Sequence, residues 1–298
     1  MRDMASSVLA KLKNKSKELE ITYQQCLQLF VQEEFLRKLS KSKYADNLIL
    51  KGGYFIYTLT NFKSRATVDV DFLLKQVPAS LEEVKEVIDN IITTPTGNEY
   101  IRMTARGLEE ISVQRKYKGI STQIIAEIKR VRIPFTIDIG VGDVIISDAQ
   151  LSKVNTQLSD FEKPEIKTYS LESVVAEKFD AMLLRFEFTS RMKDFYDVYY
   201  VSQTFDFDGV ILQAAIYETL QHRGTDYDSS SFERILELVN DEKIQWRWRH
   251  FQKGMPGVFI EFSEVMDYIQ KFLEPIFNTI INETQFLLNW SAVKSQWI

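Results

Sequence analysis

The chain has 298 residues, 45% of them hydrophobic and 27% charged, and a formal net charge of −5. This length predicts about two domains with real hydrophobic cores. No apolar run reaches the length of a transmembrane helix, and the N-terminus lacks the apolar segment of a signal peptide. The single cysteine, Cys26, excludes an internal disulfide and a cysteine-based zinc site. We therefore expect a cytoplasmic protein with no membrane partner.

The charge is distributed unevenly along the chain. Residues 1–150 hold 22 Lys+Arg and 19 Asp+Glu, whereas residues 151–298 hold 15 and 23. The acidic total argues against a general nucleic-acid coat but permits a local basic patch that contacts phosphates. The basic residues that gather late in the first half are Arg102, Arg106, Arg115, Lys116, Lys118, Lys129, Arg130 and Arg132.

The first half alternates helical and extended patterns. Residues 5–45 are predicted to be helical, because apolar side chains recur every four positions. Ser80 and Glu83 have the spacing of a capping box at the start of a later helix. The elements expected after residue 45 are a strand at 47–50, a helix at 54–62, the strand that carries Asp69 and Asp71, a helix at 81–92, and strands at 99–113 and 121–139, which together predict a small mixed sheet.

Asp69 and Asp71 are the first candidate site residues. Residues two apart in a strand point to the same face of the sheet. Two carboxylates so close repel each other, and burying them unpaired is costly. A divalent cation removes that cost, and hard oxygen ligands suit Mg²⁺.

A glycine pair follows the first expected strand, in the segment Lys51-Gly52-Gly53. Glycine takes positive φ and lets a ligand approach the backbone closely. The helix that starts here offers unpaired N–H groups, which form an anion site. Carboxylates that bind a metal beside such a turn make a nucleoside triphosphate the natural ligand.

Arg65 and Thr67 lie in the loop just before the acidic strand. The planar guanidinium binds phosphate oxygens in a bidentate manner. The alternative is a loop arginine paired with an Asp or Glu.

Asp138 is the third candidate carboxylate, inside the apolar run Thr-Ile-Asp-Ile-Gly. An unpaired charge there would be expensive, so we expect either a metal shared with Asp69 and Asp71 or a salt bridge to a nearby arginine. Asp143 is a second choice, in a glycine-rich turn where aspartate is ordinary.

The second half is expected to follow a linker at 161–165. Ser170 can cap a helix that runs to Arg185, and Lys178 lies beside the apolar face of that helix. Lys178 could reach triphosphate oxygens, or it could be an ordinary snorkelling lysine.

A motif with two aspartates follows on the next expected helix. Asp194 and Asp197 are three residues apart and share a helix face, while Lys193 and Asp197 are four apart and can pair. An ion-pair network is the alternative to a functional role.

Helices are expected at 210–222, 230–240 and 263–290. Between them, Trp-Arg-Trp-Arg-His at 246–250 interleaves aromatic and basic residues. Such residues can stack on bases and hold phosphates. The alternative is that the tryptophans pack inward and the arginines are solvated.

The ordered motifs resemble those of a known family. Lys-Gly-Gly, a helix, Arg-x-Thr-x-Asp-x-Asp-Phe and a later Arg-x-Lys-Asp-Phe-x-Asp, together spanning about residues 47–200, resemble the AbiEii/AbiGii nucleotidyltransferase toxins of abortive-infection and toxin–antitoxin systems. The resemblance implies an α/β polymerase β-like nucleotidyltransferase domain at 1–160. An all-α domain at 161–298 would follow, with the nucleotide held in a cleft between the two.

The resemblance also implies the chemistry. Asp69, Asp71 and Asp138 would bind one or two Mg²⁺ ions and, with Lys178 and Asp194, form the catalytic set. The residues implied to bind the nucleotide are Lys51, Gly52, Gly53, Arg65, Thr67, Lys178, Lys193 and Asp197.

The reaction would move NMP from an NTP to an acceptor hydroxyl. The basic stretch at 102–132 favours RNA, such as tRNA, as the acceptor. The family context implies a cognate antitoxin encoded nearby. Two other functions stay open: a nucleotidyltransferase that modifies a small molecule, and a regulator that binds nucleotide without catalysis.

Overall fold

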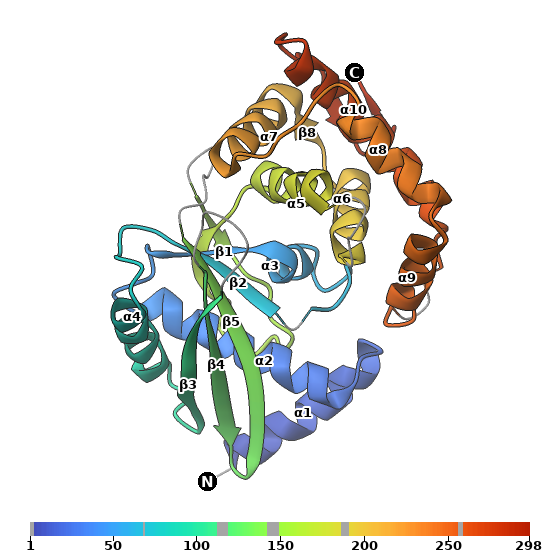
Figure 1. Cartoon of the computed structure of the whole chain (residues 1–298). Helices are drawn as coiled ribbons and strands as arrows, with labels where there is room; N and C mark the ends of the chain where they lie inside the picture. The colour runs from blue at the N-terminus through green and yellow to red at the C-terminus, as the bar shows by residue number, and fades with distance from the viewer. Residues whose placement is uncertain (1–2, 68, 112–118, 142–148, 186–190, 256–258) are drawn as a thin grey trace. The chain divides into compact units, whose positions relative to one another are not determined.

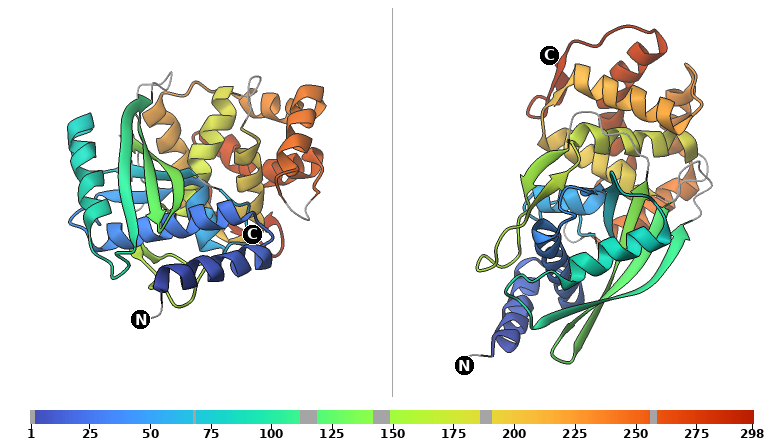
Figure 2. Two further views of the ribbon diagram at one scale, coloured as in Figure 1. Left: turned by 90° about the horizontal axis from the view of Figure 1, so that it is seen from below. Right: turned by 90° about the vertical axis from the view of Figure 1, so that its left-hand side faces the viewer.

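The computed structural model describes residues 3–67, 69–111, 119–141, 149–185, 191–255 and 259–298. The described residues form two compact units, the first ending at Tyr169 and the second running from Ser170 to Ile298. Figures 1 and 2 show the elements of both units. The first unit extends past the boundary expected at residue 160.

The described residues of unit 1 form a seven-stranded mixed sheet with the order β3-β4-β5-β2-β1-β7-β6. β5 pairs antiparallel with β4 and parallel with β2, and β1 pairs antiparallel with β2 and parallel with β7. A mixed sheet was predicted, but β7 arises in the segment expected to start the second domain. The strands are β1 (Leu48–Lys51), β2 (Asp69–Leu74), β3 (Ile101–Ile111), β4 (Gly119–Ile128), β5 (Val131–Val141), β6 (Gln150–Lys153) and β7 (Glu165–Thr168).

The helical stretch expected at 5–45 is two helices. Glu20 has a φ of 53°, and Thr22 then starts the second helix through a capping box with Gln25, so the chain turns between them. Ser80 caps a later helix as predicted, accepting the Glu83 N–H. The helices of unit 1 are α1 (Met4–Glu18), α2 (Tyr23–Lys41), α3 (Gly52–Leu59) and α4 (Leu81–Thr93).

Helix α2 covers one face of the sheet. The ring of Phe35 packs against Phe72 of β2 and Phe135 of β5, with centroid distances of 5.9 and 6.3 Å. Side chains alternate between the two faces along a strand. The neighbours of Phe72 in β2 and the even-numbered residues of β5 therefore point to the other face of the sheet.

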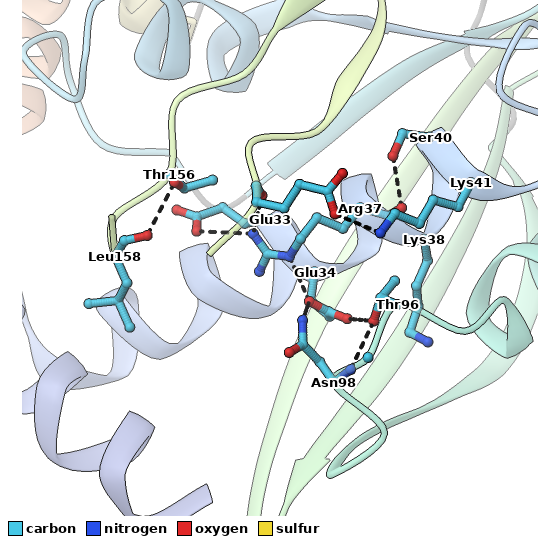
Figure 3. A network of polar contacts seen from close by, with 12 residues as sticks. Glu33, Glu34, Arg37, Lys38, Ser40, Lys41, Thr96, Asn98, Thr156 and Leu158 are labelled. Carbon is cyan, nitrogen blue, oxygen red and sulfur yellow. Dashed lines mark hydrogen bonds and ion pairs between the residues drawn. The ribbon is translucent and has the colours of Figure 1, made fainter. Parts of the chain in front are cut away.

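Helix α2 also carries a buried polar network, shown in Figure 3. Glu33, Glu34 and Arg37 are at most 1% exposed. Arg37 Nε donates to Glu34 at 2.7 Å, Asn98 Nδ2 donates to Glu34 at 2.9 Å, and the backbone N–H of Gln157 donates to Glu33 at 2.9 Å. Two loops are thereby tied to the core, because each donates a hydrogen bond to a buried carboxylate of α2.

Unit 2 is mainly helical, but it also contains a three-stranded sheet with the order β10-β9-β8. The expectation of an all-α second domain is therefore wrong in this detail. Its elements are α5 (Leu171–Arg185), α6 (Met192–Thr204), β8 (Phe207–Asp208), α7 (Gly209–Arg223), α8 (Ser231–Leu236), the 3₁₀ helix η2 (Glu237–Asn240), α9 (Glu242–Gln252), α10 (Phe262–Ile281), β9 (Asn289–Ser291) and β10 (Gln296–Trp297).

The helix expected at 263–290 ends at Ile281. Glu283, with a φ of 52°, turns the chain out of the helix. Trp290 then lies in β9, donates its indole N–H to the Ser202 carbonyl at 2.6 Å and packs against Phe272 of α10. Burial of this large ring and satisfaction of its donor favour the strand over continued helix.

Candidate functional site in unit 1

Strand register brings the three predicted carboxylates to one face of the sheet. In the parallel pair β2–β5, Asp71 lies opposite Asp138 and Asp69 lies opposite Thr136. Residues opposite each other on paired strands share a face, as do residues two apart. All three aspartates therefore point away from the face that α2 covers.

Two further residues lie in the same row across the strands. Lys51 of β1 is opposite Asp71, and Ser121 of β4 is opposite Asp138. Ser121 Oγ donates to Asp138 Oδ1 at 2.6 Å. This hydrogen bond orients the side chain of Asp138.

The first turn of α3 lies against Asp71. Gly52 has a φ of 72°, and a Cβ added there would meet Asp71 Oδ2 at 2.3 Å. That contact and the left-handed backbone both require glycine. The glycine pair and the acidic strand, separated in the sequence, thus form one local structure.

Arg65 and Thr67 lie beside the second glycine. A Cβ added to Gly53 would be 2.8 Å from Arg65 Nη2 and 3.6 Å from Thr67 Cγ2. Lys51, which precedes the helix, makes no side-chain cap, and its Nζ lies 5.4 Å from the ring centroid of Tyr169. The helix start is therefore flanked by two cationic side chains, an arrangement that favours anions.

The donor set suits a hard cation, since it consists of carboxylates on one face. In the part of the chain that the structure describes, however, no group of three or more His, Cys, Asp or Glu side chains is arranged to hold a metal ion. The strands fix the positions of the three aspartates. Their residue type and their common face on paired strands are what a divalent cation would need.

The basic stretch predicted in unit 1 is only partly described, and two of its described residues form ion pairs. Asp143 lies outside the described residues, as do Arg115, Lys116 and Lys118 of the basic stretch. Lys129 forms an ion pair with Asp3, and Arg132 Nε lies 2.8 Å from Glu127. Part of the positive charge expected to face phosphates is therefore neutralised within the protein.

A second group of predicted residues meets in unit 2. Lys178 of α5 is 8% exposed, and its Nζ lies 3.0 Å from Asp194 Oδ1 and 2.6 Å from Asp197 Oδ2, both on α6. Arg191 Nε lies 2.7 Å from the other oxygen of Asp194. The snorkelling alternative for Lys178 is wrong, because the ammonium is buried between two carboxylates.

Sequence spacing did not reveal the pairing of Lys178 with Asp197, since the two residues lie on different helices. Asp194 and Asp197 do share a face of α6, as their spacing predicted, and both are at most 3% exposed. A buried carboxylate needs a partner cation, and Lys178 supplies one to both aspartates, with Arg191 as a second cation for Asp194.

Ser121 is the site residue that sequence reasoning missed. Its signal was the tight turn at Lys129-Arg130: Ile128 pairs with Val131 across it, and counting back along both strands places Ser121 opposite Asp138. A two-residue hairpin loop fixes the register of its strands. Recognising that turn would have identified the contact.

No helix among the described residues is both long and apolar enough to span a membrane. In a comparison with curated proteins, no sequence matches. Solved structures also match this chain. MenT4, a nucleotidyltransferase toxin from Mycobacterium tuberculosis H37Rv, is 13% identical with a TM-score of 0.56, over 92% of this chain and 99% of that chain. JHP933 from Helicobacter pylori is also 13% identical, with a TM-score of 0.44, over 85% and 94%.

A match to a protein-family model identifies the family of this chain. The model described as "Nucleotidyl transferase AbiEii toxin, Type IV TA system" matches residues 34–271, which include both groups of predicted site residues. The resemblance seen in the motifs is thus confirmed, and the likeness to MenT4 shows that the fold is that of a nucleotidyltransferase toxin. This chain belongs to the AbiEii family of nucleotidyl transferase toxins of type IV toxin–antitoxin systems.

Proposed function

We propose that this chain transfers NMP from an NTP to a hydroxyl group of RNA, in a reaction that requires Mg²⁺. The observation that carries the proposal is the β2–β5 register, which places Asp71 opposite Asp138 and puts Asp69 on the same face. The contact between Gly52 and Asp71 supports it further, because it brings the helix start that would bind the triphosphate next to the carboxylates.

Asp69, Asp71 and Asp138 would hold the metal. When bound, Mg²⁺ neutralises charge on the triphosphate and makes the acceptor hydroxyl easier to deprotonate. The acceptor oxygen attacks the α-phosphorus, the bond from that phosphorus to the bridging oxygen of the β-phosphate breaks, and pyrophosphate leaves. Asp138, oriented by Ser121, would accept the hydroxyl proton.

The triphosphate would be bound by Lys51, Arg65 and the N–H groups of Gly52 and Gly53. Preorganised donors of this kind act most strongly on charge that develops in the transition state. Thr67 lies beside Arg65 and would help to position it.

The roles that the resemblance implies for the second group remain predictions. Lys178, Lys193 and Asp197 would support nucleotide binding, and Lys178 and Asp194 would support catalysis. The ion pairs of Lys178 with Asp194 and Asp197 also stabilise unit 2, whatever part these residues take in the reaction. Family membership implies an antitoxin partner, which we propose is encoded next to this gene and relieves growth inhibition by the toxin.

The test is a transfer assay with the full chain. The protein is incubated with total cellular RNA and each α-³²P-labelled NTP in turn, GTP and CTP included, with Mg²⁺ or with EDTA. We expect label on an RNA band with Mg²⁺ and none with EDTA. The Asp71→Asn variant should lose the signal.

Two results would overturn the proposal. Label transferred only to small molecules in an RNA-free extract would identify a small-molecule nucleotidyltransferase. Calorimetric binding of NTP that is equal in Mg²⁺ and EDTA, with no transfer to any acceptor, would indicate a nucleotide-binding regulator. Without metal, bringing a triphosphate to three carboxylates is repulsive, so metal dependence of binding separates these outcomes.

A further inference from the structure

Helix α9 of unit 2 carries a concentration of positive charge in an acidic part of the chain. Residues 170–298 contain 12 Lys+Arg against 20 Asp+Glu, yet positions 243–253 contain four basic residues and no acidic one. The acidic residue of α9 is Glu242, in the first turn, where it complements the helix dipole. This local charge is opposite in sign to its surroundings.

The two tryptophans of α9 point in opposite directions, because residues two apart on a helix lie on nearly opposite faces. Trp248 is 1% exposed, packs on Phe262 and donates its indole N–H to the Ile260 carbonyl at 2.7 Å. Trp246 is 64% exposed. The inward-packing alternative is therefore right for Trp248 and wrong for Trp246.

The exposed tryptophan forms a platform with a second ring. Trp246 and His250 stack with an angle of 14° between their planes and 5.5 Å between their centroids. His250 is itself exposed. One aromatic plane is thus held in a fixed direction while most of the indole surface remains in contact with water, which is unusual for so large an apolar side chain.

Three cations surround the platform: Lys243, Arg249 and Lys253. They lie three residues before or after Trp246 or His250, so they share the exposed side of the helix. Among the described residues, none of the three has an ion-pair partner. By contrast, Lys178, Arg191, Arg223 and Arg234 of the same unit each lie within 3.2 Å of a carboxylate oxygen.

We infer that this surface, formed by Lys243, Trp246, Arg249, His250 and Lys253, binds single-stranded RNA. A flat aromatic surface bordered by cations matches a nucleic acid whose bases are unpaired: a base stacks on the indole while the cations contact phosphates. An acidic protein would satisfy the cations but would leave the indole plane without a matching surface. The inference rests on the proposed RNA acceptor, for which it names a binding element.

The test measures RNA affinity directly, without NTP, by fluorescence anisotropy. The probe is a fluorescein-labelled oligouridine of about 12 nucleotides, at several salt concentrations. Trp246→Ala should weaken binding about tenfold, because stacking one base is worth that much. Trp246→Phe should restore most of the affinity, since it keeps an aromatic plane.

The cations are tested by charge reversal. Arg249→Glu should weaken binding and reduce the slope of log Kd against log salt by about one phosphate contact. Lys294→Glu is the matched control: it makes the same change of charge at an exposed lysine of the same unit, and it should have little effect. Trp246→Ala removes an exposed side chain, so the thermal unfolding of this variant should match that of the unmodified protein.

The outcomes separate this inference from the proposed function. Asp71→Asn should reduce transfer on the order of 10²–10³-fold and leave RNA affinity unchanged. If Trp246→Ala and Arg249→Glu bind the oligonucleotide as tightly as the unmodified protein, the inference is wrong even where transfer is intact. If a polyglutamate peptide binds as tightly as the RNA and is equally insensitive to Trp246→Ala, the surface is a general anion site that suits a protein partner, which also overturns it.

Discussion

The predicted aspartates of the two units differ in burial and in the groups that they contact. In unit 1, Asp69, Asp71 and Asp138 are exposed or half-buried, and the contact that the structure gives Asp138 is a neutral hydroxyl, Ser121. In unit 2, Asp194 and Asp197 are buried, with the Lys178 ammonium within 3.0 Å of both.

This difference separates two uses of the same side chain. A carboxylate that is already paired with a buried cation has its charge neutralised and gains little from a metal ion. Carboxylates on one face of adjacent strands repel one another, and a divalent cation relieves that repulsion. The strand set is therefore suited to bind a metal, and the helix set is suited to hold α5 against α6.

The strongest test of this contrast is Lys178→Met. Removing the ammonium takes away the cation that the two buried carboxylates share, while Arg191 still lies 2.7 Å from Asp194, so the free energy of unfolding should fall by about 3 kcal/mol. Urea denaturation measures it. Adding Asp194→Asn and Asp197→Asn to the same protein should recover much of the loss, because no buried charge then remains unpaired. A triple variant as unstable as the single one would show that packing, not charge, is the cause.

Asp71→Asn should have the reverse effect. It removes a proposed metal ligand at a half-buried position, so transfer should fall on the order of 10²–10³-fold while the urea midpoint stays nearly unchanged. Asp89→Asn, on an exposed face of α4 in the same unit, is the control and should transfer normally. Full activity in Asp71→Asn would refute the assignment of the strand carboxylates.

Gly52→Ala tests whether the position of the Asp71 carboxylate matters. The added methyl group would overlap Asp71 Oδ2, and displacing a catalytic group by about 1 Å can cost about 10²-fold in rate. Gly97→Ala is matched, since Gly97 also has positive φ, at 89°, but has no atom near the position of a Cβ. Both variants should lose similar stability through backbone strain, and only Gly52→Ala should lose transfer.

Glu33 is a buried carboxylate with a more distant cation, 3.9 Å from Arg37 Nη1. Burial raises its pKa to about 7. Between the unfolded pKa near 4.5 and about 7 the native state keeps a proton that the unfolded state releases, so the free energy of unfolding falls as pH rises through this window. The fall should amount to no more than about 3 kcal/mol.

Urea midpoints between pH 5 and 8 measure this effect, and Glu33→Gln should flatten the profile. Glu86→Gln is the control. Hydrogen bonds from Lys43 and Tyr44 lower the pKa of Glu86, so its contribution is lost only as pH falls below its unfolded pKa, outside this window. A slope between pH 5 and 8 that persists in Glu33→Gln would assign the titration to another group.

The sequence by itself determined much of unit 1. The period of two along β2 places Asp69 and Asp71 on one face, whatever the rest of the chain does. Gly52 and Gly53 were expected to let a ligand approach the backbone, and the groups that the structure shows close to them are the side chains of Asp71 and Arg65. Local signals such as the Ser80 cap were sufficient because the groups that form them are neighbours in the chain.

Only the tertiary structure decided what depends on contacts between distant segments. Pairing of β2 with β5 put Asp138 beside Asp71, and packing of α5 against α6 buried Lys178 between two aspartates. Contacts with Ser202 and Phe272 made a strand of residues 289–291 where a helix was expected. The helical period places Trp246 and Trp248 on opposite faces of α9. Which of the two is buried was decided by the packing of Trp248 on Phe262, because the free energy of burial depends on the surface that a partner offers and not on the residue alone.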